Sequence, residues 1–159
     1  MRMNRTRIPS IWKALLTIVL AIAVNGCAEF QVENDMNLHD KLFECPDRPN
    51  CVSSDAEDSR HAVAPMVLIC DTATGWAAIQ TLVSLLSRST VVKATDRYMH
   101  VTFKSRLFRF IDDLELKLDP QSGAIAIRSA SRAGYFDLGV NRRRVESLRE
   151  QLTADGLIR

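Results

Sequence analysis

The chain has 159 residues, of which 47% are hydrophobic and 25% charged, a size and composition typical of one folded domain rather than a disordered protein. Its net charge of +2 includes four basic residues and no acidic ones within the first 27 residues. Without that region, the chain has 17 basic and 19 acidic residues. This slightly acidic remainder lacks the broad positive field that neutralising many phosphates requires, which argues against nucleic acid as a partner.

The N-terminus has the three-part pattern of a secretory signal. Residues 1–13 are basic, an uncharged apolar run extends from Ala14 to Val24, and a short segment then leads to Cys27. The apolar run is far shorter than the ~20 residues that a membrane-spanning helix needs. We therefore expect residues 1–26 to be a cleaved signal peptide.

The tetrad Val24-Asn25-Gly26-Cys27 resembles the bacterial lipobox, in which the cysteine becomes lipidated and is the new N-terminus. This resemblance implies a palmitate-type lipid anchor on Cys27 and a domain in the cell envelope that faces an oxidising, periplasmic compartment. Multiple acylation gives stable membrane anchoring without a spanning helix. The neutral Ala28 after the cysteine suggests the outer membrane in a cell that has two membranes.

Residues 27–44 carry acidic and amide side chains without a sustained period, and we expect them to be a tether. The segment that follows, CPDRPNC, holds Cys45 and Cys51. In an exported protein this spacing favours a disulfide, although a metal site or a redox pair is also conceivable. Cys70 has no evident partner, and its apolar surroundings predict a small buried side chain.

Hydrophobic periodicity predicts two helices and four strands. The expected elements are a helix over 74–87, strands over 91–94, 98–104, 113–118 and 124–129, and a helix capped by Asn141 and ended by Gly156. This order predicts an α+β fold, in which a meandering antiparallel sheet of about four strands has both main helices packed on one face. Matching apolar positions would place Leu114 opposite Ile127 and Asp113 opposite Arg128, with Glu115 as a diagonal neighbour.

Three motifs, CPDRPNCVSS, SRLFRFIDDLELKL and IRSASRAGYFDLGVNRRRVESLREQL, occur in this order between Cys45 and Leu152. The chain thereby resembles the family called domain of unknown function 1499, from which it departs at Arg109, where many members have glycine. The resemblance implies a single α+β domain over residues 45–155. It brings no established activity and no catalytic residues.

The densest polar grouping lies in the second half of the chain and has two interpretations. The candidate ligand-binding residues are Arg128, Ser129, Ser131, Arg132, Tyr135, Asn141 and Arg142; the candidate structural residues are Asp112, Asp113, Glu115, Asp137 and Arg144. Arginine and carboxylate groups can satisfy one another and lock the loop over 130–140 against the sheet. Alternatively, Arg128, Arg132 and Arg142 could form a pocket for a phosphate or carboxylate near the N-terminus of the last helix.

Catalysis is less well supported by the sequence. Asp112 and Asp113 are adjacent, so in a strand they point to opposite faces and cannot act as a dyad. The sequence has no phosphate loop and no common hydrolase or metalloprotease motif, and we expect no catalytic residue, metal or cofactor. The chain is thus predicted to be a lipid-anchored envelope protein that binds a small anionic ligand or a protein partner. The alternatives are a hydrolase-like envelope enzyme using Asp113 or Glu115, or a purely structural envelope protein.

Overall fold

The computed structural model describes residues 42–159. The signal peptide, Cys27 and the tether up to residue 41 lie outside the described residues. The elements, in chain order, are β1 (Cys51–Ser53), β2 (Met66–Val67), α2 (Thr72–Ser84), β3 (Ser89–Ala94), β4 (Tyr98–Lys104), β5 (Ile111–Leu118), β6 (Ala124–Ser131) and α3 (Val140–Ala154). None of the helices within this part of the chain is long and apolar enough to cross a membrane.

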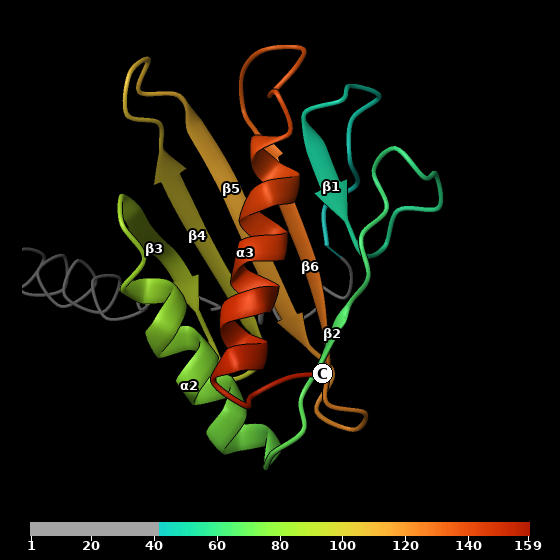
Figure 1. Ribbon diagram of the computed structural model, residues 1–159, viewed down its shortest axis with the longest axis vertical. Helices are drawn as coiled ribbons and strands as arrows, with labels where there is room; N and C mark the ends of the chain where they lie inside the picture. The colour runs from blue at the N-terminus through green and yellow to red at the C-terminus, as the bar shows by residue number, and fades with distance from the viewer. Residues whose placement is uncertain (1–41) are drawn as a thin grey trace, which may run out of the picture. The chain divides into compact units, whose positions relative to one another are not determined.

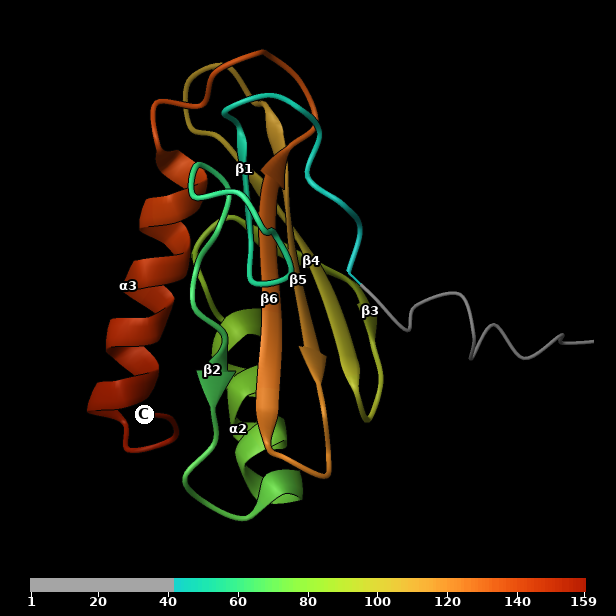
Figure 2. The same ribbon diagram turned by 90° about the vertical axis from the view of Figure 1, so that its right-hand side faces the viewer.

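The predicted α+β fold is confirmed. Both helices of the described part cover one face of an antiparallel sheet (Figures 1 and 2). The sheet has six strands rather than about four, in the order β1-β6-β5-β4-β3, with β2 also paired to β6. The additional strands β1 and β2 have three and two residues, too few for an alternating pattern to be visible in the sequence.

The core lies between the sheet and the helices, on what we call the helix face. Alternation along β5 turns Leu114, Leu116 and Leu118 toward this face, where they are almost fully buried. The helices contribute apolar stripes at helical spacing. These consist of Trp76, Ile79 and Val83 from α2 and Val145, Leu148 and Leu152 from α3. Packing continues to the C-terminus, since Ile158 is buried and bridges to Leu68.

The predicted register between β5 and β6 was wrong by two residues. Leu116, not Leu114, lies opposite Ile127, and Arg128 therefore faces Glu115 directly instead of Asp113. The cause is the tight turn after β5, where Asp119 N donates to Ala124 O and the Asp119 carboxylate accepts from Gln121 N and Ser122 Oγ. A shift of two residues preserves the faces, so the buried set was still predicted correctly.

Three local predictions also need correction. Helix α2 spans residues 72–84 rather than 74–87, because the Asp71 side chain accepts from Thr74 N and starts the helix earlier. Asn141 is not the cap of α3 but a buried residue inside it; Asp137 instead accepts from the backbone N–H groups of Gly139 and Asn141. Cys70 is exposed rather than buried, because it lies in the connection between β2 and α2.

Candidate functional site

The polar side chains of β5 and β6 lie on both faces of the sheet, because adjacent residues of a strand point to opposite faces. Asp112 pairs with Arg144 of α3 at 2.6 Å, on the helix face. Asp113 points the other way, as the alternation predicts, and binds Arg132 at 2.8 Å. The single polar grouping suggested by the sequence is therefore two separate networks.

The network on the face away from the helices, called here the Glu115 network, consists of Tyr98, His100, Asp113, Glu115, Arg128 and Arg132. The Glu115 side chain is 2% exposed and accepts hydrogen bonds from Arg128 Nη1 and from Tyr98 Oη, each at 2.7 Å. Beside it, His100 Nε2 lies 2.7 Å from Asp113 Oδ1. Antiparallel pairing places Tyr98 and His100 on the same face as Glu115, and this brings the two pairs side by side.

Burial and charge shift the pKa values of two groups in the Glu115 network. Burial raises the pKa of the Tyr98 phenol well above its ordinary value, and its hydrogen bond to Glu115 raises it further. Burial also tends to raise the pKa of Asp113, but the hydrogen bonds from Arg132 and His100 outweigh it and lower that pKa. With these shifts, Asp113 is ionised and Tyr98 is protonated near neutral pH.

The chain that precedes β1 lies against the Glu115 network. Leu42 is buried, and Glu44 O accepts from Arg128 Nη2 at 3.5 Å. Arg128 Nε and Asn50 Oδ1 are the buried side-chain polar atoms without a hydrogen-bond partner among residues 42–159. Residues 42–44, expected at the end of the tether, thus take part in the packing of the domain.

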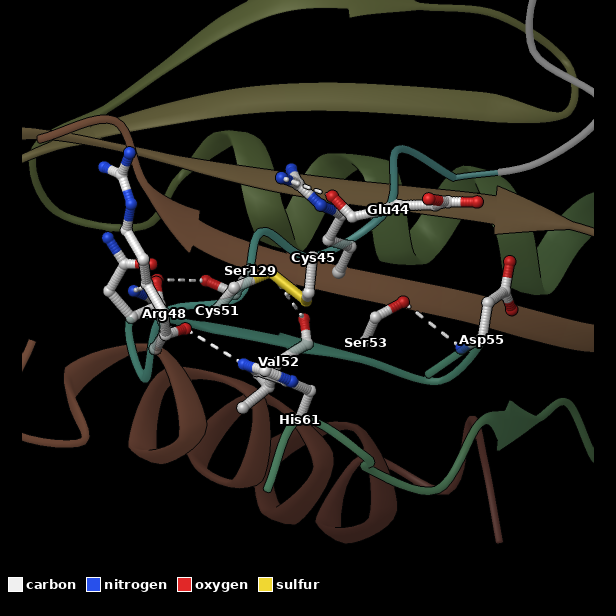
Figure 3. Close-up of a disulfide and its surroundings, with 12 residues drawn as sticks. Glu44, Cys45, Arg48, Cys51, Val52, Ser53, Asp55, His61 and Ser129 are labelled. Atoms are coloured by element: carbon white, nitrogen blue, oxygen red, sulfur yellow. Dashed lines mark hydrogen bonds between the residues drawn. A yellow bond between two sulfur atoms is a disulfide. The ribbon is translucent and has the colours of Figure 1, made fainter. Parts of the chain in front are cut away.

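The predicted disulfide between Cys45 and Cys51 is confirmed (Figure 3). It closes the loop just before β1, with the Cα atoms 5.6 Å apart. His61 holds the same loop, because its Nε2 lies 2.9 Å from Arg48 O (Figure 3). Its Nδ1 lies 2.7 Å from Asp58 Oδ2. The hydrogen bond from His61 is the main cause that lowers the pKa of Asp58.

The network on the helix face, called here the Asn141 network, consists of Asn50, Asp112, Ser129, Ser131, Asp137, Asn141 and Arg144. The fully buried Asn141 amide donates to Asn50 O, Ser131 Oγ and Asp137 Oδ2 within 3.0 Å, and its oxygen accepts from Ser129 and Arg144. Arg144 also lies over the Phe103 ring at 4.7 Å. This network fastens the loop after β6 to the sheet.

The structure does not bring together the three arginines of the predicted anion pocket. Arg128 and Arg132 belong to the Glu115 network, whereas Arg142 extends from α3 to the carbonyl oxygens of Ala62 and Arg60, each at 2.9 Å. Ser129, Ser131 and Asn141 are bound within the Asn141 network. Of the candidate ligand-binding residues, Tyr135 is 68% exposed, and the Arg132 side chain is 52% exposed although it is paired with Asp113.

A surface that the sequence reasoning did not single out lies at one end of the sheet. It is formed by residues 105–110 and 132–139, which we call the apical loops. Their exposed large apolar side chains are Leu107, Phe108, Phe110, Tyr135, Phe136 and Leu138. A signal was present in the sequence, since the runs LFRF and YFDL place large apolar residues in segments that fit neither helix nor strand.

Comparison with known proteins supports the resemblance noted from the motifs. A family model described as Protein of unknown function (DUF1499) matches residues 41–152, which is most of the chain. No curated protein matches the chain, and no solved structure does. The chain therefore belongs to the DUF1499 family.

Proposed function

We propose that this chain is an envelope protein held to a membrane by a lipid on Cys27, and that its domain is a binding module which engages a partner through the apical loops. The observation that carries the binding role is the cluster of exposed apolar side chains on these loops. Leu107, Phe108 and Leu138 are 78%, 69% and 72% exposed. Contiguous apolar patches on a folded domain commonly mark interaction sites.

The location rests on two features of the N-terminal region. The tetrad ending at Cys27 resembles a lipidation signal, and the disulfide between Cys45 and Cys51 is of the kind that persists in oxidising compartments. The neutral Ala28 favours the outer membrane where two membranes exist. Both features support an exported, anchored protein.

The two polar networks support a binding role through the apical loops rather than through an arginine pocket. Arg128 and Asp113 have ionic partners within the chain, and the Asn141 amide is surrounded by hydrogen-bond partners. Groups engaged in this way contribute to the stability and the rigidity of the loops. A small anion would have to compete with Glu115 for Arg128.

Lipidation is tested by feeding cells an alkyne-labelled palmitate and recovering the full chain. We expect label on the parent protein and on Cys70→Ser, the matched control at the exposed cysteine, and none on Cys27→Ser. Label retained on Cys27→Ser would refute the anchor.

For the binding role, a photo-crosslinking amino acid at Phe108 should give adducts in intact cells, whereas the same group at Ile69 should not.

Ile69 is a suitable control because it is an exposed apolar residue, and its neighbour Leu68 bonds to Gly123 in the turn between β5 and β6, at the opposite end of the sheet. Equal adduct yields at Phe108 and Ile69, or no adduct at either position, would contradict a binding site on the apical loops.

A further inference from the structure

The apical loops form one continuous end of the domain. Residues 105–110 precede β5 and residues 132–139 follow β6, and these two strands pair as neighbours, with Asp112 opposite Ser131. Arg132 N also donates to Ile111 O at 3.0 Å. Both views show the two loops projecting from the same end of the sheet, the upper end in Figures 1 and 2. Exposed apolar residues of two separate segments thus lie at the same end of the domain.

Hydrogen bonds hold the apical loops in shape. Ser105 N donates to Phe110 O and Phe110 N donates to Ser105 Oγ, each at 2.8 Å. This closes the first loop and leaves the rings of Phe108 and Phe110 stacked at 5.6 Å. In the second loop, Arg143 donates to Leu138 O at 2.9 Å. The side chains therefore face solvent in an ordered arrangement, and a partner would not need to order them.

Positive charge accompanies the apolar side chains. Arg106 and Arg109 are exposed in the first loop, which contains no acidic residue. In the second loop, the Asp137 carboxylate accepts from the backbone N–H groups of Gly139 and Asn141. Arg109 has a φ of 56°, in the left-handed region that favours glycine, yet an arginine occupies the position. The apical loops are both apolar and cationic.

From this combination we infer that the partner of the apical loops is a membrane surface containing anionic lipids. Aromatic and leucine side chains beside arginines are the chemistry by which peripheral proteins enter the interface of a bilayer, and each basic residue near an anionic surface adds attraction. The inference deepens the proposed function, because a lipid on Cys27 would keep the domain at a bilayer and raise the effective concentration of that surface. Leu107 and Phe108 enter the headgroup region while Arg106 and Arg109 contact lipid phosphates.

The test uses the full lipidated chain reconstituted into vesicles, so that anchoring and docking are measured separately. The vesicles contain phosphatidylcholine either alone or with phosphatidylglycerol, together with brominated lipids that quench tryptophan within the bilayer. Tryptophan is placed by Phe108→Trp in one variant and by Ile69→Trp in the control; the buried Trp76 supplies a constant background. Flotation reports anchoring, and quenching reports docking.

We expect quenching of the tryptophan at position 108 in phosphatidylglycerol vesicles and none at position 69. Adding Arg106→Gln and Arg109→Gln should lower the ratio of docked to undocked domain by roughly thirtyfold. The exposed pair Lys93→Gln and Arg97→Gln, away from the apical loops, should leave this ratio unchanged and serves as the charge-matched control.

Every other outcome overturns the inference. Flotation without quenching at position 108 would exclude membrane docking while leaving the anchor and a protein partner in place. Recognition of anionic lipid would be excluded if quenching were as strong on phosphatidylcholine alone as on vesicles with phosphatidylglycerol. It would also be excluded if quenching did not change when Arg106 and Arg109 are replaced. A chain that neither floats nor carries fatty acid would overturn the proposed anchored function itself.

Discussion

Arg128 binds the carboxylate of Glu115 at 2.7 Å across two neighbouring strands, on the sheet face opposite to α2 and α3. The Arg128 side chain is 11% exposed and that of Glu115 is 2% exposed. Arg128 also donates to Glu44 O and Tyr98 Oη donates to Glu115, so the ion pair lies in a largely buried site. Removing one partner of such a pair leaves the other as an uncompensated buried charge.

The first prediction is that Glu115→Ala lowers the free energy of unfolding by about 3–5 kcal/mol, because it leaves Arg128 and the Tyr98 hydroxyl without their partner. Glu146→Ala is the matched control. Its carboxylate is 46% exposed and pairs with Arg149, so the expected loss is about 0–1 kcal/mol. Urea unfolding followed by circular dichroism measures both; a loss below about 1 kcal/mol for Glu115→Ala would contradict a buried ion pair.

The second prediction concerns acid stability. Because the pKa of Asp113 in the folded protein lies below its ordinary value of about 4, the ionised carboxylate adds stability above that pH. This contribution is lost as the pH falls through the lowered pKa. The difference in stability between the parent protein and Asp113→Asn should therefore shrink below about pH 4. Thermal unfolding between pH 7 and 2 measures it.

Arg132→Gln provides the control for this dependence. It removes a hydrogen-bond donor that lowers the pKa of Asp113, so the acid loss attributed to Asp113 should be smaller and should be complete at a higher pH. A difference between the parent and Asp113→Asn that stays constant over the whole pH range would show that Asp113 does not ionise with a lowered pKa.

The third prediction concerns the disulfide. Cys45 and Cys51 are six residues apart, and opening such a short loop should lower the free energy of unfolding by about 2 kcal/mol through the entropy of the unfolded chain. The double variant Cys45→Ser/Cys51→Ser and the parent protein in reductant should lose the same amount. Cys70→Ser, at the exposed free cysteine, should lose almost nothing. Equal unfolding midpoints with and without reductant would contradict the expected stabilisation.

The fourth prediction concerns the loop over residues 132–139. Asn141→Ala should cost about 3 kcal/mol, because several buried partners of the amide lose a hydrogen bond. Hydrogen exchange of the backbone amides of residues 132–139 should accelerate more than that of β4. Gln151→Ala, on the exposed side of α3, is the control and should change neither. Unchanged exchange in Asn141→Ala would show that the network does not hold the loop.

Much of the sheet was accessible from the sequence because its longer strands alternate cleanly. The residue bounds of β4 were predicted to the residue, and the helix face of β5 follows from Leu114, Leu116 and Leu118. Alternation specifies which side chains share a face of the strand, but it does not specify the register. A shift of two residues along the neighbouring strand leaves the faces unchanged. The turn after Leu118 decides between Asp113 and Glu115 as the partner of Arg128, and the hydrogen bonds of Asp119 are not visible in a pattern of hydrophobicity.

The composition of the Glu115 network could not be predicted for a related reason. Asp113, Glu115 and Arg128 were recognised as polar residues of one region, but Tyr98 and His100 were not joined to them. Their inclusion depends on which residues of β4 face β5, a long-range relationship that only the pairing of the strands establishes. The split between Asp112 and Asp113 was predictable, since it needs nothing beyond the pleat of one strand.

Strand β6 pairs with β5 along one edge and with both β1 and β2 along the other. The N-terminal strands end at Val67, whereas β6 begins at Ala124, more than 50 residues later. A chain emerging from the ribosome therefore displays β1 and β2 long before their partner exists, and non-local pairing of this kind forms late. The bond between Cys45 and Cys51 needs no such partner. A nascent chain stalled before Ala124 could hold this disulfide while β1 and β2 still lack β6, the strand with which both of them pair.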